Sequence, residues 1–164
     1  FKSIEENYNS IKEFVKQNVK TRPTVLSGLP FRDSWFISPG NSYISCLIND
    51  AGGNYLWKDT QSEISMPLNI ETVFIKSLKA DFWFNIGTVN SKEEIILLDS
   101  RLAALPCFKN GNLFNNNKRM GPAGGNDYWE SGALSPHVVL LDIASVLHPE
   151  LFNDHELFYF KKVE

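Results

Sequence analysis

Two separated stretches of the chain carry the side chains best suited to binding chemistry. Residues 35–53 read WFISPGNSYISCLINDAGG, and residues 124–150 read GGNDYWESGALSPHVVLLDIASVLHPE. Each stretch places aromatic side chains and a glycine-bearing loop before an apolar run of helical period, an arrangement that fixes a binding rim to a rigid scaffold. Aromatic faces with a few polar groups can hold a small organic ligand. The two stretches together predict a ligand site.

The candidate binding side chains are four aromatic and two polar residues. Flat apolar faces suit a macrocycle or a catecholate, and a guanidinium suits a bidentate contact with an anionic group. The candidates are Trp35, Phe36, Arg119, Asn126, Tyr128 and Trp129. Core packing is the alternative for each aromatic, and it competes most strongly for Phe36 and Tyr128. Trp83 lies within an apolar strand, so we expect it in the core.

Patterns for catalysis or metal binding are weak. Residues 121–125, Gly-Pro-Ala-Gly-Gly, could cradle a phosphate, but the sequence has neither GxxxxGK[ST] nor GxGxxG, and neither GxSxG nor HExxH. His137, His148 and His155 share no specific metal-ligand spacing with another His, Cys or carboxylate, so we expect structural roles for them. We therefore predict no catalytic residue, no metal site and no resident cofactor.

The composition predicts one domain with a sizeable core, since 43% of the 164 residues are hydrophobic and 13% aromatic. The 16 basic and 19 acidic residues give a formal net charge of -3 without a long run of either sign, which disfavours nucleic acid as a partner. No apolar run approaches the roughly 20 residues of a membrane-spanning helix. Cys46 and Cys107 lack a ligand spacing, and we expect two buried free thiols.

The elements that must position the candidate residues alternate between helix and strand. Predicted strands lie at 24–28, 54–57, 81–86, 113–115 and 157–160. Predicted helices lie at 4–19, 43–51, 70–79, from 91, at 100–105 and at 136–147. Such alternation predicts an α/β fold, with a mostly parallel central sheet, helices on both faces, and functional loops at the carboxyl ends of strands. The loops 29–40, 87–90 and 116–127 leave such ends.

Capping residues and breakers mark the ends of these helices. Asn41 or Ser42, Asn69 and Ser91 can cap helix amino termini, and Pro136 suits a first helical turn. The chain opens at Phe1 directly within a helical pattern and without an initiator methionine, so we expect a segment entered partway along a longer chain.

Several of these motifs stand in a familiar order. The first strand ends in SGLP, then follow PGNSYISCLINDAGGNYLW, ADFWFNIG and FKNGNLFNNN, and NDYWESGALSPHVVLLDIASVLHPEL closes the series. In this order the sequence resembles the substrate-binding proteins of iron-siderophore, haem and cobalamin ABC importers. The resemblance covers nearly the whole chain but only the carboxyl-terminal lobe of those two-lobed receptors. It assigns 1–20 to the end of the interlobe helical region and 21–164 to a three-layer α/β lobe.

The resemblance implies a non-enzymatic binder that holds a metal chelate in an interlobe cleft and delivers it to an ABC permease at the inner membrane. The chelate would be a ferric siderophore, haem or a corrinoid. Glu130 stands where corrinoid-binding relatives carry a glutamate that docks on permease arginines, in the order Tyr128-Trp129-Glu130 and then Ser135-Pro136. A solvated surface glutamate is the alternative. The resemblance also implies a monomer in the periplasm or cell envelope, held by a lipid anchor.

A carbohydrate- or peptide-binding module of similar fold is a second hypothesis. Aromatic side chains with Asn85, Asn126 and Asp127 would suit sugar hydroxyls equally well. Haem, corrinoids and many ferric siderophores absorb visible light, whereas sugars do not, so ligand colour separates the two hypotheses. The sequence leaves open which chelate is carried and whether a single lobe binds it.

Overall fold

The central sheet has five strands in the order β4-β1-β6-β7-β8. The computed structural model describes residues 2–164, so Phe1, the first residue of the expected interlobe segment 1–20, lies outside the described residues. The strands are β4 (Asn54–Tyr55), β1 (Thr24–Ser27), β6 (Phe82–Phe84), β7 (Leu113–Asn115) and β8 (Lys161–Lys162). All neighbours pair in parallel except β7 and β8, which are antiparallel. The predicted mostly parallel sheet is confirmed.

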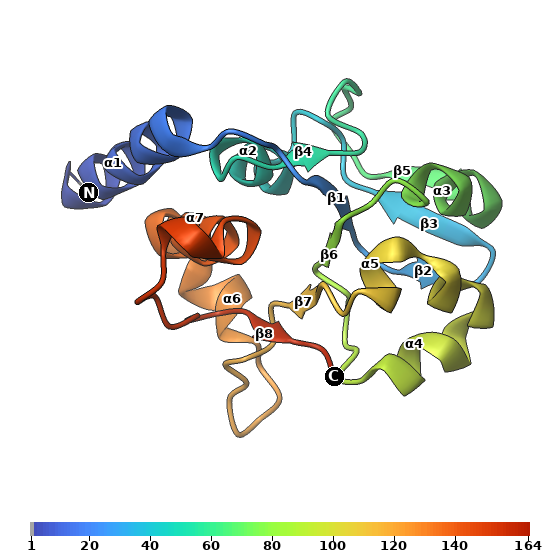
Figure 1. The fold of residues 1–164 in the computed structure, drawn as a ribbon. Helices are drawn as coiled ribbons and strands as arrows, with labels where there is room; N and C mark the ends of the chain where they lie inside the picture. Colours follow the sequence, from blue (N-terminus) through green and yellow to red (C-terminus); the bar gives the residue numbers. More distant parts are fainter. Residues whose placement is uncertain (1) are drawn as a thin grey trace.

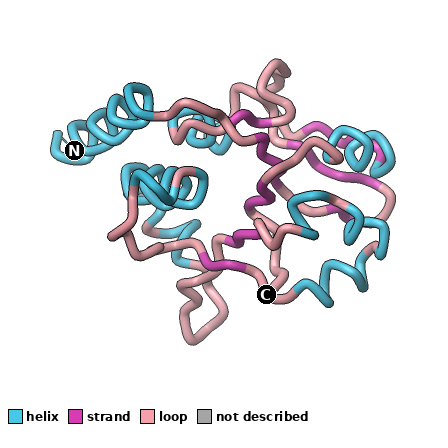
Figure 2. Tube along the Cα trace, in the orientation of Figure 1, coloured by secondary structure: helices cyan, strands magenta, loops and turns pink. Residues whose placement is uncertain are grey.

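Helices cover both faces of this sheet, as Figures 1 and 2 show. One side carries three helices that contact each other, α1 (Lys2–Asn18), α2 (Tyr43–Asp50) and α7 (Pro136–Leu147). The other side carries α3 (Ile70–Ser77), α4 (Lys92–Leu98) and α5 (Pro106–Lys109). Short helical turns complete the chain: η1 (Ser100–Ala104), α6 (Asp127–Glu130), η2 (Gly132–Leu134) and η3 (Pro149–Leu151). The predicted α/β architecture is confirmed.

Capping contacts confirm the predicted amino termini of three helices. Asn69 Oδ1 accepts a hydrogen bond from Glu71 N at 2.8 Å, and the Ser42 and Ser91 hydroxyls cap α2 and α4 in the same way at 3.4 Å. Such caps satisfy backbone N–H groups that have no partner within a helix. At the other end of α2, Gly52 takes a φ of 81°, a conformation open to glycine.

A second sheet is absent from the sequence-based expectation, which treats 29–40 as a loop. The structure forms an antiparallel sheet of β2 (Pro30–Phe31), β3 (Ser34–Ile37) and β5 (Met66–Asn69), with β3 in the middle. Arg32, at a φ of 56°, lies in the turn between β2 and β3. These strands are too short to show a clear alternating pattern, and Pro67 lies in an edge strand, where the missing N–H is tolerated.

The sheet core consists of side chains without solvent exposure, including Leu26, Trp83 and Phe84. Trp83 is core as predicted, and its indole Nε1 donates to the Gly28 carbonyl oxygen at 2.7 Å. Cys107 is also buried, and burial raises the pKa of its thiol to about 12. The expectation of two buried thiols is wrong for Cys46, because the solvent-facing side of α2 carries it.

A buried carboxylate anchors the carboxyl-terminal segment. Asp142 of α7 is fully buried, and its two oxygens accept hydrogen bonds from Phe158 N, Tyr159 N and Phe160 N at 2.7 to 3.2 Å. His155 Nε2 lies 2.7 Å from Asp142 Oδ1. The predicted strand at 157–160 is therefore wrong. The backbone donors of 158–160 bond to a side chain instead of a neighbouring strand, and pairing begins only at β8.

Two histidines make structural contacts. His155 contacts Asp142, and His148 Nε2 lies 3.2 Å from the Gly52 carbonyl oxygen, where burial lowers the pKa of the imidazole. Among residues 2–164, no three His, Cys, Asp or Glu side chains gather closely enough to hold a metal ion. Within the same residues, no helix is both long and apolar enough to span a bilayer.

Replacing the buried carboxylate should destabilise the fold strongly. Asp142→Ala leaves buried N–H groups of 158–160 without an acceptor, so we expect the free energy of unfolding to fall by about 3–5 kcal/mol. Asp154→Ala, at an exposed position in the same region, should change it by less than about 0.5 kcal/mol. Urea denaturation followed by circular dichroism measures both. A loss below about 1 kcal/mol for Asp142→Ala would contradict the anchoring role.

Candidate functional site

Loops from the carboxyl ends of β6 and β7 enclose a pocket of about 410 Å³ together with the start of α6. We call it the asparagine pocket, because amide side chains dominate its wall. Its lining is Asn85, Gly87, Thr88, Asn90, Asn116, Asn117, Met120, Gly124, Asn126 and Trp129. This is the edge of the sheet where α/β folds place their ligands. Two of the three loops expected to carry function therefore meet at one site.

Asn115, at the end of β7, holds the two loops together. It is fully buried, and its Oδ1 accepts from Ile86 N at 2.9 Å while its Nδ2 donates to the carbonyl oxygens of Gly87 and Val89 at 3.1 and 2.8 Å. Asn85 begins the β6 loop with a φ of 53°, a conformation that asparagine tolerates better than most residues. The pocket wall is thus fixed by hydrogen bonds between loops.

Trp129 is the aromatic side chain that the structure presents to this pocket. It is 68% exposed, and its ring packs edge-on against Tyr128 with centroids 4.8 Å apart. Asn126 lines the pocket and also caps α6, accepting from Tyr128 N at 3.1 Å. These two predicted site residues are brought together at the pocket.

Tyr128 does not belong to an exposed rim, so that prediction is wrong. The side chain is 4% exposed and packs edge-on against Tyr159 and Phe160. Burial raises the pKa of its hydroxyl, an effect that the nearby amides of Asn85 and Asn116 partly offset. Tyr128 therefore supports the pocket from behind as a neutral phenol.

Trp35 is also wrongly predicted as a rim residue. It is fully buried, 5.6 Å from Trp83 by ring centroids, and its Nε1 donates to the Ser27 carbonyl oxygen at 3.3 Å. The pleat of β3 turns Trp35 inward and Phe36 outward, since successive side chains of a strand point to opposite faces. Phe36 is 51% exposed but is not part of the pocket lining.

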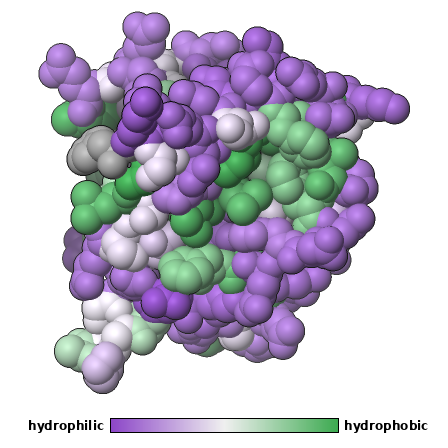
Figure 3. All heavy atoms as spheres, turned by 90° about the vertical axis from the view of Figure 1, so that its left-hand side faces the viewer, coloured by the Kyte–Doolittle hydropathy of each residue, from purple (hydrophilic) through white to green (hydrophobic). Residues whose placement is uncertain are grey.

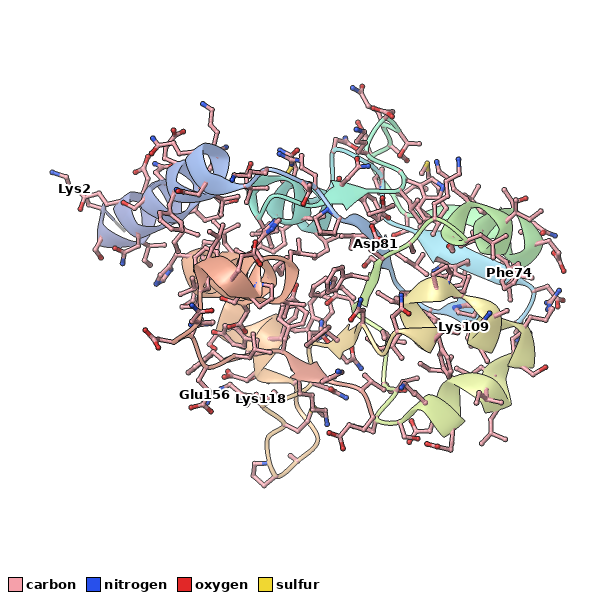
Figure 4. All side chains as sticks on the ribbon, viewed as in Figure 1. Lys2, Phe74, Asp81, Lys109, Lys118 and Glu156 are labelled. Atoms are coloured by element: carbon pink, nitrogen blue, oxygen red, sulfur yellow. The ribbon has the colours of Figure 1, made fainter. Side chains whose placement is uncertain are left out.

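A second hollow, of about 580 Å³, lies on the loop that precedes α6. Its lining is Lys118, Arg119, Met120, Gly121, Pro122, Ala123, Gly125, Asp127 and Glu130. Arg119 Nε donates to Asp127 Oδ2 at 2.7 Å and lowers the pKa of that carboxyl, while its guanidinium carbon lies 4.2 Å from the centroid of the Phe158 ring. Figure 4 shows Lys118 beside Glu156, its partner at 3.3 Å. The charges of this hollow are largely paired within the protein.

Asn116 and Asn117 are functional candidates that the sequence-based reasoning leaves out. They are 3% and 6% exposed. A run of three asparagines, which begins at the last residue of the predicted strand 113–115, is the signal that could have found them, because polar residues at a strand's carboxyl end face the ligand edge of the sheet.

Comparisons with known proteins give two relatives of undetermined function, and no family model matches the chain. Both are uncharacterised lipoproteins of Methanocaldococcus jannaschii. One is 26% identical over 165 residues, which is 99% of this chain and 37% of that protein. The other is 27% identical over 169 residues, which is 97% of this chain and 41% of that protein. The chain therefore spans about two fifths of the length of these curated relatives.

Several solved structures share the fold of this chain. The TroA-like periplasmic binding protein FepB of Veillonella parvula matches with a TM-score of 0.69 and 16% identity, over 99% of this chain and 55% of that one. An ABC transporter solute binding protein of Sulfurospirillum deleyianum gives 0.67 and 17%, over 94% and 46%. The chain has the fold of a lobe of a TroA-like periplasmic binding protein. A periplasmic haem-binding protein of Pseudomonas aeruginosa also matches this TroA-like lobe, at 0.64 and 12%, over 99% and 58%.

Truncation of the two tryptophans should destabilise the fold to very different degrees. Trp35→Ala empties a fully buried site of the TroA-like lobe, so we expect a loss of about 3–5 kcal/mol in the free energy of unfolding. Trp129→Ala removes an exposed ring with one aromatic contact and should cost about 1 kcal/mol or less. Urea titrations of both variants measure the difference. Equal losses would show that the assignment of Trp35 to the core and Trp129 to the pocket is wrong.

Proposed function

We propose that the chain is the carboxyl-terminal lobe of the substrate-binding component of an ABC importer for a metal chelate, a ferric siderophore, haem or cobalamin. The observation that carries this proposal is the asparagine pocket with its exposed Trp129, at the ligand edge of a lobe whose fold ABC substrate-binding proteins share. The proposed role is binding without catalysis, which agrees with the binding-protein names of these structural neighbours.

The proposal includes a second lobe that completes the cleft. The curated relatives are more than twice as long as this chain, and the structural neighbours are about twice as long. Exposed apolar side chains, Phe14 of α1, Trp129 of α6 and Leu134 of η2, are further support. Figure 3 shows apolar patches among hydrophilic atoms on the face that carries α1 and α7. In this scheme 1–20 ends the interlobe helical region and 21–164 forms the lobe.

The proposed location is the periplasm or cell envelope, with a lipid anchor on the full-length protein. The lipoprotein names of both curated relatives and the periplasmic names of the structural neighbours support it. The partner would be an ABC permease at the inner membrane, contacted by a monomeric receptor. Glu130 is exposed, follows Trp129 directly and lines the second hollow, so its carboxylate is accessible to permease arginines.

Ligand titration tests the proposed function. The two-lobed protein, with residues 1–164 for comparison, is titrated with haem, cyanocobalamin and several ferric siderophores, and tryptophan fluorescence is read with inner-filter controls. We expect one chelate to bind at micromolar or tighter affinity, and Trp129→Ala to weaken it by about tenfold because a stacking surface is lost. Binding of a colourless sugar or peptide instead of any chelate would favour the second hypothesis, for which the amide-rich lining is the supporting observation.

Permease docking gives a separate prediction. In vesicles that contain the cognate permease, Glu130→Gln should weaken receptor binding by up to about fivefold, the size of one exposed charge contact, without changing chelate affinity. Glu63→Gln, at another exposed position, is the matched control. If Glu130→Gln docks as tightly as the control, Glu130 is a solvated surface residue and the docking role is wrong.

A further inference from the structure

The asparagine pocket contains two buried acceptors without partners. Asn117 is 6% exposed, and its Nδ2 donates to the Val89 carbonyl oxygen at 3.2 Å and to Asn90 Oδ1 at 3.1 Å. These two bonds fix the orientation of the amide and leave Asn117 Oδ1 buried without a donor among the described residues. Asn85 Oδ1, in the opposite loop, is also buried without a donor among the described residues. A buried acceptor without a donor is costly, so each oxygen calls for an N–H or O–H group.

The walls of the pocket are uncharged. Among the described residues that line it, the polar side chains are amides and one hydroxyl, with no acid or base. Two charged side chains are hydrogen-bonded to the lining residue Asn90: Lys161 Nζ donates to Asn90 Oδ1 at 3.1 Å, and Asn90 N donates to Glu94 Oε2 at 3.0 Å. These two charges have opposite sign. The pocket therefore offers an anionic ligand no dedicated counter-charge.

The neighbouring hollow does not supply that charge. Arg119 is bonded to Asp127 at 2.7 Å, and Lys118 is bonded to Glu156 at 3.3 Å. Each of these cations is therefore already partly neutralised by a carboxylate of the protein. A divalent cation is also poorly served, because the pocket's free oxygens belong to amides, and hard cations favour sites that include carboxylates.

We propose that the part of the ligand held by this lobe is uncharged and fringed with amide N–H or hydroxyl groups. These donors would meet the side chains of the lining asparagines, among which the Oδ1 atoms of Asn85 and Asn117 have no donor in the protein, and a ring or apolar face would lie against Trp129. This inference rests on the proposed function and narrows its ligand to neutral chelates over polyanionic ones. The asparagines recognise the edge of the chelator, and the metal stays within it.

The test compares two ferric siderophores of different charge and two metal macrocycles of different charge. Ferrichrome is an uncharged ferric hydroxamate on a ring of peptide amides, and ferric enterobactin is a trianionic catecholate. Cyanocobalamin is uncharged and fringed with carboxamides, and haem carries anionic propionates. Calorimetric titration of the two-lobed protein at about 0.05 and 0.5 M NaCl reports affinity and its salt dependence. We expect an uncharged probe to bind at least about tenfold tighter than its anionic counterpart, with less than about twofold change with salt.

Asn85→Gly is the decisive variant, because glycine adopts the positive φ of this position and so removes the amide without backbone strain. It should weaken the uncharged probe by about tenfold, the loss of roughly one buried hydrogen bond. Asn153→Gly, at an exposed position, is the control, and thermal melting of both variants confirms that the fold is retained.

The outcomes separate the two proposals. Tighter binding of an anionic chelate, with steep salt dependence, would overturn the neutral-ligand inference while the importer function stands. If no chelate binds but a neutral oligosaccharide or peptide does, and Asn85→Gly weakens it, the donor-fringed ligand stands while the chelate function fails. Unchanged affinity of Asn85→Gly for the best probe would overturn the assignment of the asparagines.

Discussion

The carboxylate of Asp142 is the constraint on which the site ultimately depends. It binds the backbone N–H groups of 158–160 and so fixes the side chains of Tyr159 and Phe160. Phe160 packs edge-on against Phe84 of β6, and the Tyr159 hydroxyl lies 2.8 Å from Ser131 Oγ at the end of α6. One buried acid thus joins α7, the carboxyl-terminal segment and the helical turn that presents Trp129. A buried carboxylate acts here as a positioning group, because the backbone N–H groups that it accepts from would lose their acceptor if the segment moved.

A second polar group in the core performs the same task for the loops. Asn115 bonds to three backbone groups of the loop after β6, so the walls of the asparagine pocket are set by amide contacts that carry no charge. Because these supporting contacts are uncharged, they place no charge in the pocket wall. The nearby ion pairs of Arg119 and Lys118 lie in the adjacent hollow, which leaves amide groups and an indole to meet a ligand.

The sequence predicts the parts of this molecule in which a local rule and burial agree. Helices with Asn69 or Ser91 caps and the nearly continuous apolar strand containing Trp83 are found as expected. The errors occur where a contact between residues far apart in the sequence determines burial or strand pairing. Trp35 is in the core because β3 pairs with β5, a strand more than 30 residues away in the sequence, and its position in β3 turns its side chain inward. Residues 157–160 have high strand propensity, but the backbone N–H groups of 158–160 donate to Asp142 and not to a neighbouring strand. Tyr128 and Trp129 are adjacent aromatics, and only their packing against Tyr159 separates core from rim.

Under the proposed function, the arrangement of α6 also limits how a bound ligand could change the surface that a permease contacts. Trp129 lines the asparagine pocket and Glu130 lines the second hollow, so under the proposed function consecutive residues meet ligand and partner. The helix is one turn long, is capped by Asn126 and is held at its end through Ser131 to Tyr159. Its neighbours are therefore tied to the buried Asp142. A repacking of α6 alone would break this chain of contacts, whereas a movement of the whole lobe would preserve it. Under the proposed function, ligand binding would therefore be transmitted at least cost by closure of this lobe as a rigid unit against a second lobe, which would displace Glu130 without altering its surroundings.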